Sequence, residues 1–153
     1  MNTVDIENCL GRHSEEDLVR KLMMFFSIAT KPKLPRKETD AYASAPASGI
    51  ELTFTVESEI ESAKHYPEGA LVLVNVRFYG VATGEFVPYS GELPKGLRFG
   101  SSKTELIARM GEPNWSNESL RRFRWDSLNQ RLMAVFDDNE RLEICSIQHV
   151  PKR

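Results

Sequence analysis

Residues 50–79 read IELTFTVESEIESAKHYPEGALVLVNVRFY and hold the two clearest strand patterns of the chain. Residues 50–56 alternate apolar and polar side chains, which predicts a strand with one buried and one solvent-facing side. Residues 70–79 begin as a continuous apolar run and end in alternation, as a central strand does. Between the two strands, residues 57–69 form a long acidic connection. Long connections often carry function, so this segment is a candidate site.

Helical patterns precede these strands. Residues 3–10 are predicted to form a helix that ends at Gly11. Ser14 and Asp17 have the spacing of a capping box, and the apolar residues between 18 and 29 recur at helical intervals. Prolines 32 and 35 end this second helix. Residues 30–49 are rich in turn formers and predict a loop that encloses a short strand at 39–44.

The second half of the chain repeats this order of elements. A helix is predicted over residues 102–110, and strands over about 120–125, 131–136 and 142–150. We therefore predict an α+β fold of two helix-plus-antiparallel-meander units, with the helices packed on one face of an antiparallel sheet. The two units span about 1–87 and 88–153 and form a single domain.

Composition sets the class of protein. The 153 residues are 41% hydrophobic and 27% charged, as in ordinary globular domains, and the net charge is −2. No apolar run approaches the length of a membrane span, and the first ten residues lack the pattern of an export signal. Cys9 and Cys145 have no metal-ligand spacing, so free thiols are expected. We expect a globular cytoplasmic protein that binds neither a membrane nor nucleic acid.

The residues that would support catalysis are few. The sequence has no phosphate-binding glycine loop and no serine or metallohydrolase motif. His13, His65 and His149 are scattered, so metal ligation is not expected. Cys145 and His149 share one side of a strand, but four residues of extended chain separate them by about 13 Å, too far for a nucleophile and its base. We therefore predict a protein that is not an enzyme and needs neither cofactor nor metal.

Residues 88–113, PYSGELPKGLRFGSSKTELIARMGEP, are the most distinctive segment. Pro94 fixes its own φ, and Gly91 and Gly96 permit turns with positive φ. Leu97 and Phe99 are expected to be buried, and Ser102 to cap the helix that follows. These roles are structural, so we expect the segment to be scaffold and the binding surface to lie elsewhere.

The segment resembles the pattern Y-x-G-x-LP-x-GL-x-F-x-x-S, followed by a short helix that ends in LG-x-P. This pattern is typical of small immunity proteins of bacterial polymorphic toxin systems, namely contact-dependent growth inhibition, type VI secretion and Rhs systems. Met110 stands where the pattern has leucine. The element also resembles the repeat of small lipoprotein and β-lactamase-inhibitor folds, which bind proteins. The resemblance implies a protein that neutralises a cognate toxin domain, with nuclease the favoured toxin activity.

The acidic connection is the first candidate for toxin binding. If its backbone is extended, Glu57, Glu59 and Glu61 project from one side, with Glu68 nearby. These carboxylates are suited to the basic groove of a nuclease and to rapid electrostatic capture. His65 and Tyr66 are candidate aromatic anchors beside them. The alternative interpretation is a solvated acidic loop without a partner.

Arg121, Arg122 and Arg124 form a secondary candidate surface, interleaved with aromatic residues. Such interleaving is typical of nucleic-acid binding, but alternation also predicts a half-buried strand with Phe123 and Trp125 inside and arginines outside. A nucleic-acid-binding module, a general protein-binding adaptor and an enzyme with an unrecognised site therefore stay open as alternatives to an immunity protein.

Overall fold

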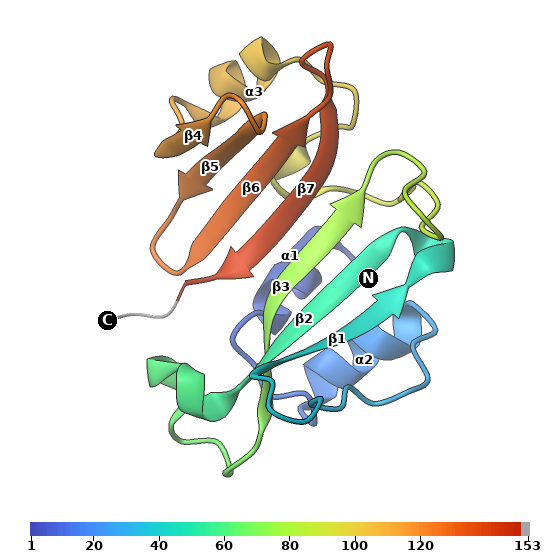
Figure 1. The fold of residues 1–153 in the computed structure, drawn as a ribbon, viewed down its shortest axis with the longest axis vertical. Helices are drawn as coiled ribbons and strands as arrows, with labels where there is room; N and C mark the ends of the chain where they lie inside the picture. The colour runs from blue at the N-terminus through green and yellow to red at the C-terminus, as the bar shows by residue number, and fades with distance from the viewer. Residues whose placement is uncertain (151–153) are drawn as a thin grey trace.

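Seven antiparallel strands form one continuous sheet in the computed structural model of the protein, which describes residues 1–150 (Figure 1). The helices are α1 (Thr3–Cys9), α2 (Asp17–Phe25) and α3 (Lys103–Met110). The strands are β1 (Asp40–Ala45), β2 (Ile50–Val56), β3 (Leu71–Tyr79), β4 (Trp115–Asn117), β5 (Arg122–Asp126), β6 (Gln130–Phe136) and β7 (Leu142–His149). None of these helices is long and apolar enough to cross a membrane.

The sheet joins the two halves of the chain. Its strand order is β1-β2-β3-β7-β6-β5-β4, so the last strand of each half lies beside the last strand of the other. These two strands, β3 and β7, pair antiparallel over residues 75–79 and 144–148. Each half contributes helical elements followed by a meander, and the predicted α+β class is confirmed.

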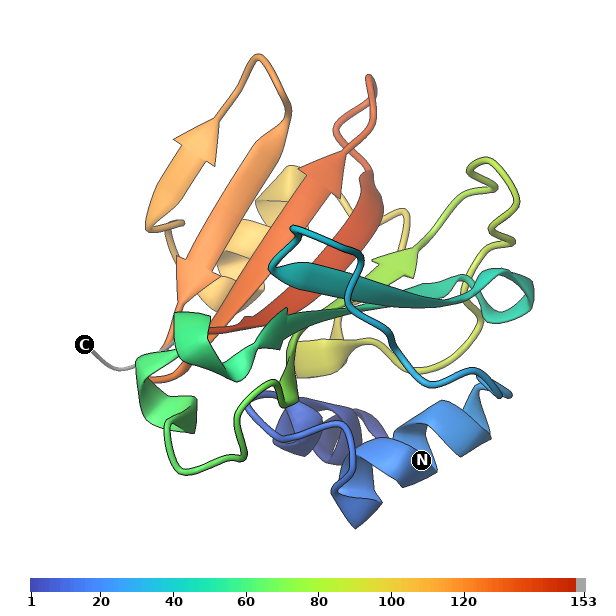
Figure 2. The same ribbon diagram turned by 60° about the horizontal axis from the view of Figure 1, so that its bottom comes forward.

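All three helices cover the same face of the sheet, as Figure 2 shows with α1 and α2 below the first three strands and α3 behind the second meander. Side chains of both halves meet there in one apolar cluster that includes Leu22, Phe54, Phe78, Leu106 and Phe136. The alternation predicted for residues 50–56 follows the sheet, because every second side chain of β2 is buried against the helices.

Local predictions succeed where a cap or a long pattern is present. Ser102 caps α3 as expected, since its hydroxyl accepts a hydrogen bond from the backbone N–H of Glu105 at 3.1 Å. The second helix is shorter than predicted, because Ser27 adopts a left-handed φ of 57° and stops it after Phe25. Its N-cap is Glu16 without a side-chain bond, so the capping box predicted at Ser14 is wrong.

The distinctive segment packs as scaffold. Leu93, Pro94 and Leu97 are buried, and Gly96 has the expected positive φ of 70°. Gly91 is not in the left-handed region, contrary to our expectation. Gly91 is required because of limited space, since a Cβ atom there would lie 2.4 Å from the Tyr89 hydroxyl oxygen.

Replacement of Gly49 by alanine is predicted to destabilise the fold. Gly49 joins β1 to β2 with a φ of 70°, and a Cβ atom there would lie 2.3 Å from the Val87 carbonyl oxygen. Left-handed strain costs about 1–2 kcal/mol, and the backbone clash adds to it. We expect Gly49→Ala to lower the free energy of unfolding, measured by urea titration, by about 3 kcal/mol.

Gly69→Ala is the matched control. This glycine also has a positive φ, of 83°, but its Cβ position is open. Its replacement should cost only the strain of about 1–2 kcal/mol. Equal losses for the two variants would contradict the close approach at Gly49.

Candidate functional site

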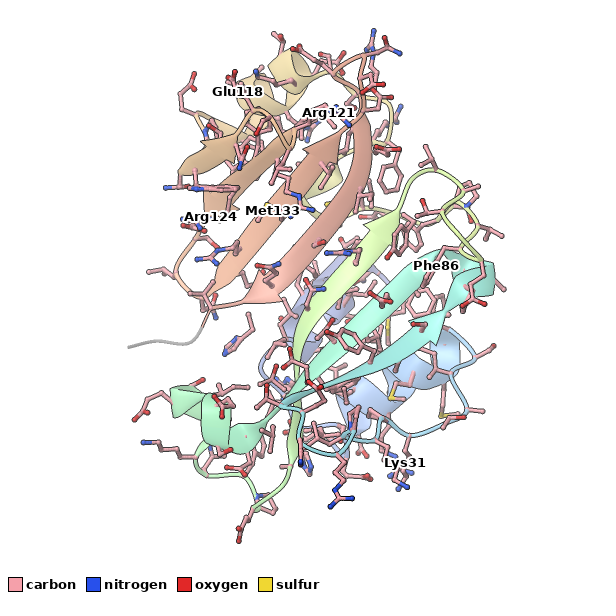
Figure 3. All side chains as sticks on the ribbon, in the orientation of Figure 1. Lys31, Phe86, Glu118, Arg121, Arg124 and Met133 are labelled. Carbon is pink, nitrogen blue, oxygen red and sulfur yellow. The ribbon has the colours of Figure 1, made fainter. Side chains whose placement is uncertain are left out.

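The face of the sheet opposite α1, α2 and α3 carries none of these three helices, and we call it the open face. Its central row of side chains crosses all seven strands in register. From β1 to β4 this row is Ser44, Glu51, Arg77, Ser146, Met133, Arg124 and Trp115. Figure 3 shows Met133 and Arg124 on this face, with the helices behind the sheet.

The acidic connection lies at one end of the open face. Ile60 and Ala63 are buried in a small apolar cluster with Val72 of β3, which fastens the connection to that strand. The hydroxyl of Ser62 lies 3.3 Å from Nε2 of His149 at the end of β7. The connection therefore adjoins both central strands, and the sheet brings the predicted acidic residues next to the open face.

The backbone of this connection is not extended, so the predicted alignment of its carboxylates is wrong. Residues 57–59 and 61–63 form two short 3₁₀ turns. With three residues per turn, side chains two positions apart point in different directions. Glu57 accepts a hydrogen bond from the backbone N–H of Gly69 at 2.8 Å, and Glu61 pairs with Lys64 at 2.8 Å. These two carboxylates hold the loop together.

Glu59 and Glu68 are the exposed acidic residues of the connection without an ion pair among residues 1–150. His65 is exposed as well, and its ring lies 4.1 Å from that of Tyr66. Tyr66 is partly buried. Its hydroxyl donates a 2.9 Å hydrogen bond to Glu16. Burial and this hydrogen bond raise the pKa of Tyr66. Tyr66 therefore braces the connection against the segment before α2.

The three arginines of the secondary surface are separated by the fold. Arg121 lies in the β4–β5 turn with a φ of 53°, where its Nε donates to the Phe136 carbonyl at 3.0 Å and its guanidinium pairs with Asp138 at 2.9 Å. Arg122 and Arg124 lie on the open face of β5, and Phe123 is buried on the other side, as predicted. Arg121 thus stabilises the turn, whereas Arg122 and Arg124 share the open face of β5.

Sequence reasoning missed the residues at the middle of the open face. Asn75 and Arg77 lie in β3, within a run that reads as buried strand, and Tyr42 lies on β1. These three side chains, with Glu51 and Thr53, line a shallow hollow of about 510 Å³. The available signal was a polar pair two residues apart inside an apolar strand, which places both on one face.

Several buried polar atoms of the open face lack partners. Oδ1 of Asn75, Nε of Arg77 and Nε of Arg124 are buried without a hydrogen bond among the described residues. Nε of Arg124 lies 3.4 Å from Asp126, close enough for attraction but outside hydrogen-bond geometry. A buried unsatisfied group costs about 1–3 kcal/mol, so a small rearrangement that paired these atoms with water or with a ligand would be favourable.

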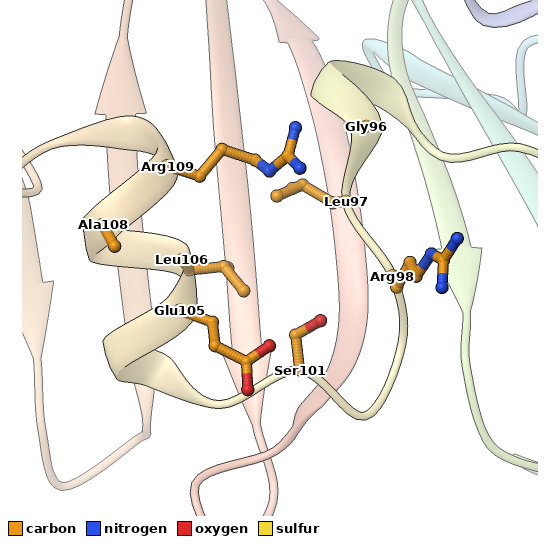
Figure 4. A pocket seen from close by; sticks show the side chains of 8 residues that line it. All are labelled: Gly96, Leu97, Arg98, Ser101, Glu105, Leu106, Ala108 and Arg109. Atoms are coloured by element: carbon orange, nitrogen blue, oxygen red, sulfur yellow. The ribbon is translucent and has the colours of Figure 1, made fainter.

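A second hollow, of about 740 Å³, lies on the helical side between the turn at residues 94–96 and α3 (Figure 4). Leu97 and Leu106 line it and belong to the core. Arg109 donates to the Lys95 carbonyl oxygen at 3.3 Å, and Arg98 points away from α3. This hollow lies where residues 96–98 pack against α3, which agrees with a scaffold role for the segment.

The two cysteines lie in the buried core, away from the open face. Burial raises the pKa of the Cys145 thiol to about 12 and that of Cys9 to about 11, so both stay protonated near neutral pH. Both thiols are free. Within residues 1–150, no three His, Cys, Asp or Glu side chains gather as a metal site.

Comparisons with known proteins show the fold alone. No protein-family model matches this sequence, and no curated protein matches it. The crystal structure of a cysteine-rich secretory protein, SAV1118, from Staphylococcus aureus subsp. aureus Mu50 is similar, with a TM-score of 0.57 at 11% identity. The match covers 93% of this chain and 44% of that one, so this chain spans less than half of its structural neighbour.

His149 is predicted to make the protein less stable in acid. It packs against Gly11 and Ser62, and burial lowers its pKa below the ordinary 6.5. As the pH falls through 6.5, the unfolded chain gains a proton here before the folded protein does, so the free energy of unfolding decreases. Urea titrations between pH 8 and pH 5 should show this decrease, with a smaller slope in His149→Gln. Parallel pH profiles for the two proteins would contradict this assignment.

Proposed function

We propose that this chain is a protein-binding module whose open face covers a partner protein, and that it acts as a cytoplasmic immunity protein. The partner is the C-terminal domain of a cognate bacterial toxin, with nuclease its favoured activity. Inhibition takes place by tight binding over the toxin's active site, without chemistry by this chain. The uncovered seven-stranded face with its unsatisfied polar groups is the observation that carries this proposal.

The dimensions of the open face suit a protein partner. Seven strands at about 4.8 Å spacing span about 29 Å, and strands of seven residues are about 23 Å long. The face is therefore about 670 Å² in projection, comparable with the roughly 800 Å² that each partner buries in a standard interface. Exposed aromatic residues lie near both edges, Tyr42 on β1 and Trp115 on β4, and such residues are frequent binding hot spots.

The sequence resemblance supplies the particular role. Residues 88–113 resemble the pattern of polymorphic-toxin immunity proteins, and because this segment packs as scaffold, we propose the open face as the toxin-binding surface. Glu59 and Glu68 of the acidic connection extend this surface with free negative charge. A nuclease partner has a basic groove, which these carboxylates would approach at one end of the sheet.

A nucleic-acid-binding module is the second candidate. The guanidinium of Arg124 lies 5.6 Å from the Trp115 ring centre, an arrangement that also binds nucleic acid by stacking and phosphate contact. Binding of RNA or DNA that weakens steeply with salt would favour this alternative.

Co-expression tests the proposal and the surface together. The C-terminal domain of the toxin encoded immediately upstream is induced with and without this protein, and the pair is then purified. We expect growth to be restored and a stoichiometric complex to form. Met133→Lys should abolish rescue and raise the dissociation constant by at least about 100-fold, because it places a charge in the central row of the open face.

Met24→Lys is the matched control, since Met24 is 77% exposed on α2, in the layer opposite the open face. This variant should restore growth like the wild type. Absence of both rescue and complex with the wild-type protein would overturn the proposal.

The acidic connection has its own test. Glu59→Lys combined with Glu68→Lys changes only exposed carboxylates that form no ion pair and no side-chain hydrogen bond among residues 1–150, so the protein should stay folded by circular dichroism. We expect the affinity for a nuclease toxin domain to fall by at least tenfold, mainly through slower association. Unchanged rates would exclude the connection from the interface.

A further inference from the structure

We propose that the hollow around Arg77 receives a single aspartate or glutamate side chain from the partner protein. This inference rests on the proposed function and names the chemistry that the centre of the open face recognises. Arg77 lies on β3, between Glu51 of β2 and Ser146 of β7 in the central row. The carboxylate would therefore contact the open face near its middle, where an interface excludes water best.

The charge of Arg77 is not neutralised within the protein. No carboxylate among residues 1–150 lies within ion-pair distance of its guanidinium, although Glu51 is its register neighbour. The Glu51 carboxylate is engaged on the other side, where Oε2 accepts a 3.4 Å hydrogen bond from the Ser44 hydroxyl of β1. The positive charge at the centre of the open face is thus available to a ligand.

The hydrogen-bonding capacity of this hollow is also unused. Nε of Arg77 and Oδ1 of Asn75 are buried without partners, and both residues line the hollow. A guanidinium presents donors in a planar fork that matches a carboxylate in two parallel hydrogen bonds. A partner carboxylate would accept hydrogen bonds from the guanidinium N–H groups of Arg77, and a rotation of that side chain would be needed to bring the buried Nε into the pair. Asn75 would join through its NH2 group, because a carboxylate cannot donate a hydrogen bond to Oδ1.

The surroundings favour a carboxylate side chain over a nucleic-acid backbone. Glu51 lines the same hollow, and Glu59 and Glu68 lie in the connection that precedes the first residue of β3. A phosphodiester chain laid across the face would bring repeated negative charges past these groups. A single carboxylate from a protein loop would be repelled within the hollow by Glu51 alone, because Tyr42 and Thr53, which also line the hollow, are uncharged.

The test measures affinity for the purified toxin domain by titration calorimetry. Arg77→Met keeps the length of the side chain and removes its charge. We expect it to raise the dissociation constant by about 100-fold or more, because a charge paired in the interface is lost. Arg77→Lys should bind more weakly than wild type, since an ammonium lacks the planar fork. Glu51→Gln should bind as well as wild type or better, because it removes repulsion beside the incoming carboxylate.

Arg98→Met is the control, because Arg98 is exposed on the helical side and should leave the affinity unchanged. Neutralising each Asp and Glu of the toxin domain in turn should identify one residue whose loss has no further effect in Arg77→Met. Stability gives an independent measurement. Arg77→Met should raise the melting temperature of the isolated protein, since it removes an uncompensated buried polar atom.

The outcomes separate the two proposals. If Met133→Lys breaks the complex but Arg77→Met binds within threefold of wild type, the proposed function stands and this inference is overturned. If the wild-type chain forms no complex, both are overturned. If the chain instead binds a single-stranded RNA oligonucleotide and Arg77→Met loses that binding, the occupant is a phosphate and the carboxylate assignment is wrong. A lowered melting temperature would show that Arg77 serves the fold.

Discussion

The pairing of β3 with β7 is the constraint on which the rest of the structure depends. It joins two short meanders edge to edge, so a sheet of three strands and a sheet of four become one sheet of seven. Side chains of both meanders share one apolar cluster under the three helices. The same pairing places Arg77 beside Ser146 and creates the wide open face. Fold and candidate site therefore arise from one contact between the halves.

Sequence patterns predicted the parts of the fold in which local and tertiary preferences agree. The alternation of residues 50–56, the cap at Ser102 and the inward Phe123 all describe single elements with one buried side. The site depends on which strands become neighbours, and no local pattern specifies that. Asn75 and Arg77 place two polar side chains on one face of an apolar strand, but only the pairing with β2 and β7 brings Glu51 and Ser146 beside Arg77. The glutamates of the connection show the opposite error, because their spacing suggests an extended chain and the backbone turns instead.

The open face combines features that stability alone does not explain. A buried guanidinium nitrogen and a buried amide oxygen without partners reduce the stability of the isolated chain. An apolar or small polar side chain at either position would avoid that cost. Proteins tolerate such conflicts chiefly at functional sites, where a partner completes the missing interactions. We infer that the core under the helices stabilises the fold, whereas the unsatisfied polar atoms of the open face lower the free energy of unfolding and are kept for recognition of the partner.

The central claim is that the open face, not the helical layer, meets the partner. Methyl NMR of the five methionines, ¹³C-labelled at the ε-methyl, tests it directly in a titration with the toxin domain. Met133 reports on the open face and Met24 on the exposed side of α2. We expect a large shift of the Met133 methyl signal at stoichiometric toxin, with the Met24 signal unchanged. A shift of Met24 with Met133 unmoved would place the partner on the helices and contradict the account.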